Sequence, residues 1–338
     1  MGKPPGKFKA AGECLVMLTI YDTTGHSLLK HNDTAPITAD TVWFDLLNPT
    51  KEEDNHVEGL LGISVPTRAE MREIEASSRF YQENGASYMT GFIVHNIDEA
   101  TLGSSTLTFI LSGNALVTVR YTDTKVFPTF HSRVERGDAT CRTGAAIMIG
   151  IIESLIEHQA DFIEKIQDKV DRIAKGTFEL QKRRTRDTKL DVLLKGTGVQ
   201  GDLVARLTES ATSFERVLHA LKNTAQERNC DGKIFQRIET ASRDLASLRE
   251  HMRFLSDRIG FLLNATLGLI SNEQNQIIKL FSVMAVMLMP PTLVASIYGM
   301  NFRHMPELAW MEGYPMALGL MVLSALIPFI YFRRKGWL

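Results

Sequence analysis

Two long runs of apolar residues stand near the C-terminal end of the chain. No charged side chain lies between Lys279 and Arg303, and a second uncharged run extends from Gly313 to Phe332. At a helical rise of about 1.5 Å per residue, such runs cover the roughly 30 Å hydrocarbon core of a lipid bilayer. The pattern predicts a two-helix transmembrane hairpin, with spans at about 277–298 and 315–332, an outer loop at 299–314 and a basic tail.

The first run carries small and weakly polar residues along one helical face. Steps of three or four residues connect them: Asn275, Ile278, Ser282, Ala285, Met289, Thr292, Ser296 and Gly299. A polar side chain in hydrocarbon needs a partner or water. This stripe therefore indicates either tight helix packing or the wall of an aqueous path.

A seven-residue apolar repeat begins near residue 145 and predicts long helices that pack as a coiled coil. Its positions include Ile149, Ile156, Ile163 and Val170, and later Ile238, Leu245, Met252, Ile259 and Thr266. A charged segment at 181–187 interrupts it. The last helix is expected from about Gly232 to Ile297, which is close to 100 Å at about 1.5 Å per residue.

One stretch matches a nucleotide-binding pattern but lacks its context. Gly196-Thr197-Gly198-Val199-Gln200-Gly201 fits G-x-G-x-x-G, yet no βαβ unit surrounds it. We interpret it as a flexible connection between stalk helices.

The N-terminal part alternates between strand and helix patterns. Segments rich in β-branched and aromatic residues predict strands at 15–21, 42–47, 88–95, 105–111 and 115–121. Ser112-Gly113-Asn114 predicts a hairpin between the last two. Thr50, with Glu53 three residues later, predicts a helix N-terminus, and Pro66-Thr67 predicts a second helix that extends to Ser77.

These patterns predict an α/β cytoplasmic domain at 1–126, a helical coiled-coil stalk at 127–274 and the transmembrane hairpin at 275–338. The apolar run Cys14–Ile20 is too short for a signal peptide. Arg333-Arg334-Lys335 follows the second span and, by the positive-inside rule, indicates that both termini are cytoplasmic.

Composition excludes several classes of function. The 38 basic and 39 acidic residues nearly balance, so the net charge gives no indication of nucleic-acid binding. Three scattered cysteines fit a reducing compartment. Glu52, Glu53 and Asp54 are typical of a solvated first helical turn rather than a metal site. We find no phosphate-cradling loop or nucleophile elbow, so neither an enzyme nor an organic cofactor is expected.

The most specific motif lies at the outer end of the first span. Tyr298-Gly299-Met300-Asn301 is followed by Met305-Pro306-Glu307-Leu308 and by Gly313-Tyr314-Pro315. This combination resembles the signature of the CorA family of divalent-cation channels. Segments 43–50, 78–81 and 88–90 resemble the cytoplasmic domain of that family less specifically. The resemblance implies a funnel-shaped homopentamer in the cell inner membrane that passes Mg²⁺, and also cobalt and nickel.

The resemblance also implies roles for individual residues. Gly299, Met300 and Asn301 would form the outer selectivity ring, since backbone carbonyls and a neutral amide can contact a hydrated ion. The implied pore lining, from the outside inward, is Thr292, Met289, then Ile278 with Phe281 or Ser282 as an apolar constriction, and Asn275 at the inner mouth. Glu307 would concentrate cations near the entrance through its charge, an effect that salt screens.

A regulatory metal site is less well marked. Some CorA proteins close when magnesium binds carboxylates between subunits. In this chain Asn264 stands where an acid is expected, so Asp257 or Glu99 is the alternative candidate.

Two other functions stay open. ZntB-type zinc transporters share the G-M-N motif and the architecture, but the M-P-E-L loop favours magnesium, and His304 alone near the mouth suits zinc. A membrane-anchored coiled-coil sensor would need neither the polar stripe nor the G-M-N end.

Overall fold

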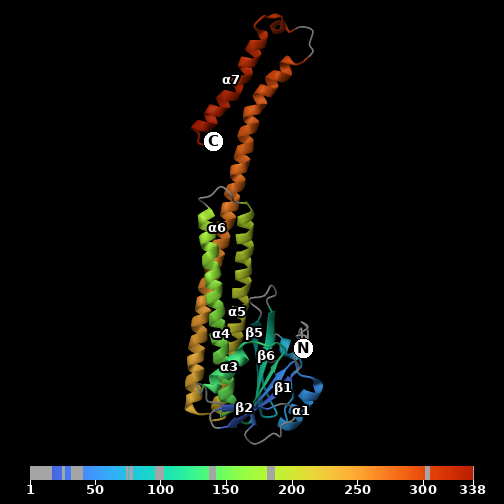
Figure 1. The fold of residues 1–338 in the computed structure, drawn as a ribbon, viewed down its shortest axis with the longest axis vertical. Coiled ribbons are helices and arrows are strands. Elements are labelled where there is room, and N and C mark those ends of the chain that lie inside the picture. Colours follow the sequence, from blue (N-terminus) through green and yellow to red (C-terminus); the bar gives the residue numbers. More distant parts are fainter. Residues whose placement is uncertain are drawn as a thin grey trace, which may run out of the picture. The chain divides into compact units, whose positions relative to one another are not determined.

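The computed structural model describes residues 17–24, 27–31, 41–73, 75, 79–95, 103–136, 142–180, 187–300 and 305–337. The chain forms two compact units. The first comprises Met1–Lys182 and Lys195–Phe261, and the second comprises Arg183–Leu194 and Leu262–Leu338. Figure 1 shows the elements of both units along the chain.

A seven-stranded sheet forms the centre of the first unit. Its strands are β1 (Met17–Thr24), β2 (Ser27–His31), β3 (Thr41–Leu47), β4 (Phe80–Glu83), β5 (Ala86–His95), β6 (Gly103–Ser112) and β7 (Ala115–Arg120). The order is β2-β1-β3-β7-β6-β5-β4. Only the β3–β7 pair is parallel among the described strands. The strand predictions and the hairpin between β6 and β7 are confirmed, and the two edge strands β2 and β4 were not predicted.

Helix α1 (Lys51–Leu61) begins as predicted. Glu53 N–H donates to Thr50 Oγ1 at 3.3 Å, and Thr50 N–H donates to Glu53 Oε2 at 2.7 Å, which together form a capping box. Val57 of this helix is fully buried in an apolar core between α1 and the sheet.

The helix predicted from Pro66 to Ser77 is wrong. The described residues there form only a single 3₁₀ turn, η1 (Glu70–Arg72). Glu73 takes up extended backbone with ψ of 141°, and its carbonyl accepts a hydrogen bond from Arg79 Nε at 2.6 Å. A hydrogen bond from a side chain six residues later thus takes the carbonyl that a continuing helix would use.

The remaining helices are α3 (Val126–Glu135), α4 (Gly144–Leu180), α5 (Asp187–Glu227), α6 (Gly232–Tyr298), η2 (Pro306–Ala309) and α7 (Gly313–Arg334). The predicted heptad positions are buried: Ile149, Ile156, Ile163 and Val170 on α4, and Ile238, Leu245, Met252, Ile259 and Thr266 on α6. The repeat therefore identified the packed faces correctly.

The interpretation of 196–201 as a flexible connection is wrong, because these residues lie inside α5. A Cβ on Gly196 would lie 3.5 Å from Ile173, and one on Gly201 would lie 3.6 Å from Ile259. Gly196 and Gly201 are packed against neighbouring helices, so tertiary contacts offset their low helix propensity, whereas Gly198 meets open space.

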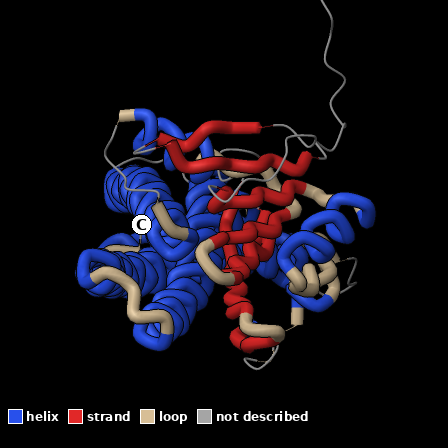
Figure 2. The backbone as a smooth tube through the Cα atoms, turned by 90° about the horizontal axis from the view of Figure 1, so that it is seen from below, coloured by secondary structure: helices blue, strands red, loops and turns tan. Residues whose placement is uncertain are grey.

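Helix α5 is fastened to the sheet at two places. Ser210 Oγ donates to the Phe92 carbonyl at 2.5 Å, and Phe92 N–H donates to Ser213 Oγ at 2.8 Å. Just after the end of α5, the Arg228 guanidinium donates to the carbonyls of Gly85 in the β4–β5 turn, Gly113 in the β6–β7 turn and Leu111 in β6, at 2.7–3.1 Å. Figure 2 shows the strands with the long helices along one side and the short N-terminal helix on the other.

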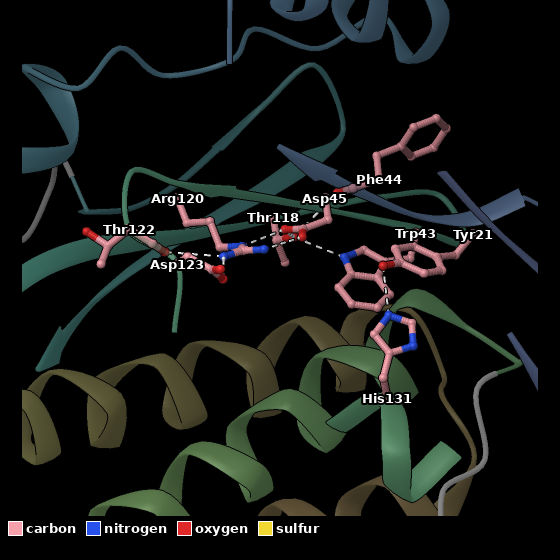
Figure 3. Close-up of polar contacts among 9 residues, drawn as sticks. All are labelled: Tyr21, Trp43, Phe44, Asp45, Thr118, Arg120, Thr122, Asp123 and His131. Atoms are coloured by element: carbon pink, nitrogen blue, oxygen red, sulfur yellow. Dashed lines mark hydrogen bonds and ion pairs between the residues drawn. The ribbon is translucent and has the colours of Figure 1, made fainter. Parts of the chain in front are cut away.

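A buried polar network lies between the sheet and α3 (Figure 3). The Trp43 indole donates to Thr118 Oγ1 at 3.0 Å, and Thr118 donates to Asp45 Oδ1 at 2.7 Å. Burial alone would lower the pKa of Arg120, but the charge and hydrogen bonds of Asp45 raise it. Tyr21 Oη lies 2.7 Å from His131 Nε2, and burial followed by the Asp45 charge raises the pKa of Tyr21. Every polar group named here has a partner, which holds this face of the sheet in one arrangement.

Candidate ion pathway in the C-terminal helices

The second unit contains an antiparallel helical hairpin. Among the described residues, α6 and α7 are the two helices that are long and apolar enough to cross a membrane. Lys279 Nζ lies 5.9 Å from the centre of the Trp337 ring, so the end of α7 returns to the start of the apolar run in α6 (Figure 1). Sequence reasoning gave Trp337 no role. The sequence feature that could have indicated its role is a tryptophan just after the second apolar run together with Lys279 at the start of the first, since aromatic and basic residues are typical of membrane interfaces.

The polar stripe of α6 is not used for packing against α7. Ile278, Phe281 and Met289 are 61%, 63% and 69% exposed, and Asn275, Ser282, Thr292 and Ser296 are exposed as well. Val283, on another face, is buried. In a single chain the stripe is therefore available to other copies, to lipid or to water.

The chemistry of the stripe is that of uncharged hydrogen-bond acceptors. Thr292 Oγ1 donates to the Leu288 carbonyl at 2.7 Å, and Ser296 Oγ donates to the Thr292 carbonyl at 2.8 Å. Both hydroxyl protons are thus taken by the backbone, and the oxygen lone pairs remain.

Two further carbonyls of α6 lack their usual helical donor, but at 100° per residue they belong to positions outside the stripe. Pro290 and Pro291 lie inside α6 and have no N–H, so the carbonyls of Val286 and Met287 have no donor four residues later. A hydrated cation presents water hydrogens to its surroundings, and the hydroxyl oxygens of Thr292 and Ser296 can receive them.

The outer end of α6 requires glycine. Gly299 N–H donates to the Ala295 carbonyl at 2.9 Å, and a Cβ on Gly299 would lie 2.9 Å from that same oxygen. Met300 N–H donates to the Ile297 carbonyl at 3.3 Å, and the Met300 side chain is half exposed. Asn301, the third residue of the predicted ring, and His304 lie outside the described residues.

A compact turn connects the two apolar helices. Glu307 lies in η2, and Gly313 packs so closely on the Glu307 carbonyl that a Cβ has no room there. Gly313 N–H donates to the Trp310 carbonyl at 3.1 Å. Trp310, Met311 and Tyr314 are exposed, as expected at a membrane surface.

The structure describes two of the three candidate regulatory residues. Asp257 and Asn264 are both exposed on α6, and Glu99 lies outside the described residues. No group of three or more histidine, cysteine, aspartate or glutamate side chains that could hold a metal is found among the described residues. A regulatory role for Asp257 or Asn264 stays a prediction.

Comparison with known proteins identifies relatives along nearly the whole chain. The sequence profile of the family described as CorA-like Mg²⁺ transporter protein matches residues 38–334. The chain is 34% identical to the magnesium transport protein CorA of Pectobacterium atrosepticum over 312 residues, which is 92% of this chain and 96% of that one. It is 32% identical to the protein of the same name from Escherichia coli K12, over 95% of this chain and 100% of the relative.

The fold matches a solved structure as well. The CorA magnesium transporter from Methanocaldococcus jannaschii superposes with a TM-score of 0.75 at 18% sequence identity, covering 96% of this chain and 99% of the other. The predicted architecture of an α/β domain, long helices and two apolar C-terminal helices is thereby confirmed.

Proposed function

This chain belongs to the family of CorA-like Mg²⁺ transporter proteins, and we propose that it carries Mg²⁺ across the cell inner membrane. The observation that carries this proposal is the identity of 32% to 34% with magnesium transport proteins over nearly the whole chain. The matched region includes both apolar helices and the turn between them. Members of this family are transporters rather than enzymes.

The proposed pathway is the stripe on α6. It offers hydroxyl and amide oxygens without a fixed charge, which suits an ion that sheds its water reluctantly and moves with a hydration shell. Ile278, with Phe281 or Ser282, would form an apolar constriction at the inner half. A hydrated ion finds no hydrogen-bond partners there, so the constriction can gate by dewetting. The same contacts with a water shell would admit Co²⁺ and Ni²⁺, which we include as further cargo.

Selection is proposed at Gly299, Met300 and Asn301. The close approach of Gly299 to the Ala295 carbonyl supports this assignment, because a larger residue would displace the backbone at the helix end. The amide oxygen of Asn301 would accept hydrogen bonds from the ion's water. Glu307 would raise the local cation concentration from the outer turn.

The proposed assembly is a homopentamer around one axis, with one stripe supplied by each copy. The exposure of the stripe in the single chain supports this arrangement, since a pore wall must be free of intrachain packing. Lys279, Arg333, Arg334 and Lys335 gather at one end of the hairpin, which supports a cytoplasmic location for that end and for both termini.

Uptake of Mg²⁺ into liposomes that contain the full-length protein tests this function. We expect flux in the wild type, and a loss of at least about tenfold in Asn301→Ala, because each subunit loses one amide contact to the hydrated ion. Asn223→Ala, at an exposed position of α5, is the matched control and should transport normally.

The same assay separates the alternatives. Zn²⁺ flux without Mg²⁺ flux would identify a zinc transporter, and normal flux in Asn301→Ala would remove the ring from the selectivity filter. If no divalent ion moves under either membrane polarity, the hairpin is an anchor and the protein is not a transporter.

A further inference from the structure

Two arginine side chains are buried among the described residues, and they are paired very differently. Arg120 is 4% exposed, and all three of its guanidinium nitrogens donate, to Asp45, Asp123 and the Thr122 carbonyl. Arg79 is 9% exposed, and its Nε donates to the Glu73 carbonyl at 2.6 Å. Within the described part of the chain, neither terminal nitrogen of Arg79 has an acceptor, and no carboxylate forms an ion pair with it.

Arg79 is held rigidly despite this missing partner. Its guanidinium carbon lies 4.4 Å from the centre of the Phe92 ring, which is a cation–π contact with β5. The hydrogen bond to the Glu73 carbonyl holds Nε in place. Both contacts leave the terminal N–H groups free, and those are the groups that recognise oxyanions in a forked geometry.

The Arg79 side chain lines an open cavity of about 290 Å³ between the β4–β5 edge of the sheet and α5. The other cationic wall residue is Arg216 of α5, which is exposed. Phe80 and Phe92 contribute apolar surface. The cavity lies entirely within the first unit, where α5 is hydrogen-bonded to β5 through Ser210 and Ser213.

The electrostatics of this cavity favour an anion. Burial, and then the repulsion from Arg216, lowers the pKa of Arg79, while Glu209 raises it. Among the described residues that line the cavity, Glu209 is the one acid. It is exposed and forms no ion pair with either arginine, although its charge acts on Arg79. A buried charge without a counter-charge is unfavourable. Two cations that face one weakly placed acid leave a net positive charge for a ligand to neutralise.

The hydroxyl groups of the cavity do not compete for that role. Thr208, Thr212 and Ser213 each donate to a backbone carbonyl of α5 at 2.7–2.8 Å. Thr90 Oγ1 lies 2.8 Å from Thr108 Oγ1. Either threonine can be the donor in this bond. Among the other described side chains of the cavity, the donors without an acceptor are therefore those of the two guanidinium groups.

We propose that this cavity is a binding site for the phosphate group of a small phosphorylated metabolite, held between Arg79 and Arg216. A phosphate dianion matches two guanidinium groups in charge and offers oxygens for both forks. The volume of about 290 Å³ is at the lower limit for small-molecule sites, so a phosphate ester or a pyrophosphate fits better than a whole nucleotide. Binding would link the β4–β5 edge to α5, one of the long helices. This inference does not depend on the proposed transport function.

Calorimetric titration of the full-length protein in detergent with inorganic phosphate and pyrophosphate tests the site. The buffer contains a chelator and no magnesium, so that capture of metal by the anion cannot contribute. We expect saturable binding, about tenfold weaker in Arg216→Ala through the loss of a charge-assisted contact. Arg206→Ala, on the same helix and paired with Asp202, is the matched control and should bind as the wild type does.

Glu209 supplies a second test that does not depend on removing an arginine. If Glu209 is the natural counter-charge of the two arginines, Glu209→Gln lowers thermal stability and leaves phosphate affinity unchanged, and the proposal is overturned. If the cavity is an anion site, the same variant binds phosphate several-fold more tightly, because a competing negative charge has gone. The proposal also fails if neither phosphate nor pyrophosphate binds, if Arg216→Ala binds equally well, or if succinate binds and the phosphates do not.

Discussion

Arg120 of β7 and Asp45 of β3 form a bidentate ion pair between two parallel strands at the centre of the sheet. Nε donates to Oδ1 at 3.0 Å and Nη2 donates to Oδ2 at 2.8 Å, with both side chains buried. Asp45 also accepts from Thr118, its neighbour across the strand pair (Figure 3). The pair therefore joins the first half of the sheet, β2-β1-β3, to the second, β7-β6-β5-β4.

Removal of one member of this pair should be strongly destabilising. Asp45→Ala leaves the Arg120 charge buried without its main partner, and we expect a loss of about 3–5 kcal/mol. For a protein of this size that lowers the unfolding temperature by on the order of 10 °C. Asp45→Leu combined with Arg120→Met removes both charges and should restore much of the loss. Thermal unfolding in detergent, followed by the fluorescence of tryptophan, measures both; equal losses in the single and double variants would contradict the argument.

Asp54 gives the first unit a defined dependence on pH. Burial, followed by the charges of Glu58 and Glu53, raises the pKa of Asp54 from 3.8 to about 6. Between these values the folded chain holds a proton that the unfolded chain releases, so the stability contributed by Asp54 is full below about pH 4 and is lost as the pH rises through about 6.

Asp54→Asn should therefore raise the unfolding temperature at about pH 7.5 and not at about pH 4. Solvent screening at this half-buried site limits the gain to about 1 kcal/mol. Glu52→Gln, an exposed carboxylate in the same helical turn, is the control and should show no such pH-dependent gain. If Asp54→Asn raises the unfolding temperature equally at both pH values, the gain does not come from the ionisation of Asp54.

The parts of the fold that could be predicted from the sequence are those in which the local pattern of apolar and polar residues decides the structure. A seven-residue repeat marks a packed face, so the spacing of Ile238, Leu245, Met252, Ile259 and Thr266 predicts the burial that the structure shows. Edge strands such as β4 show no comparable sequence pattern, because Phe80–Glu83 becomes a strand only through pairing with β5. The prediction of a flexible connection at Gly196–Gly201 failed for the same reason, since the helix at these glycines depends on packing against Ile173 and Ile259.

The functional features likewise fall into those that local sequence predicts and those that only the three-dimensional structure shows. The stripe on α6 follows from helical spacing alone, and the G-M-N motif is local in sequence. The cavity between Arg79 and Arg216 could not be found by spacing, because its walls come from strands and from a helix more than a hundred residues away. Only the buried, unpaired guanidinium in three dimensions indicates it.

Gly299 offers a test of the outer end of the proposed pore. Gly299→Ala places a Cβ 2.9 Å from the Ala295 carbonyl, so the helix end must shift. We expect Mg²⁺ flux into liposomes to fall by about tenfold or more while the protein still assembles, because the geometry of the proposed filter would depend on that turn. Gly319→Ala in α7 meets open space and is the matched control. Equal flux in both variants would mean that Gly299 is not needed for the proposed selection of ions.

Glu307 is expected to act on transport through long-range charge rather than through contact with the ion. The side chain is partly exposed in η2, on the turn that follows the G-M-N motif. At an ionic strength of about 0.01 M the Debye length is about 30 Å, so its field reaches cations that approach the entrance, whereas at about 0.15 M it falls to about 8 Å.

Glu307→Gln should therefore lower Mg²⁺ flux by about two- to threefold at low ionic strength and leave it almost unchanged at physiological salt. The measurement is the initial rate of uptake at subsaturating Mg²⁺ in buffers adjusted with choline chloride, which supplies ionic strength without a competing metal. The wild type at each ionic strength is the reference. A deficit that persists at high salt would mean that the carboxylate binds the ion or holds the turn directly. A deficit that appears only in the saturated rate would place its action after ion capture, because attraction of cations to the entrance raises their local concentration and has no effect once the site is full.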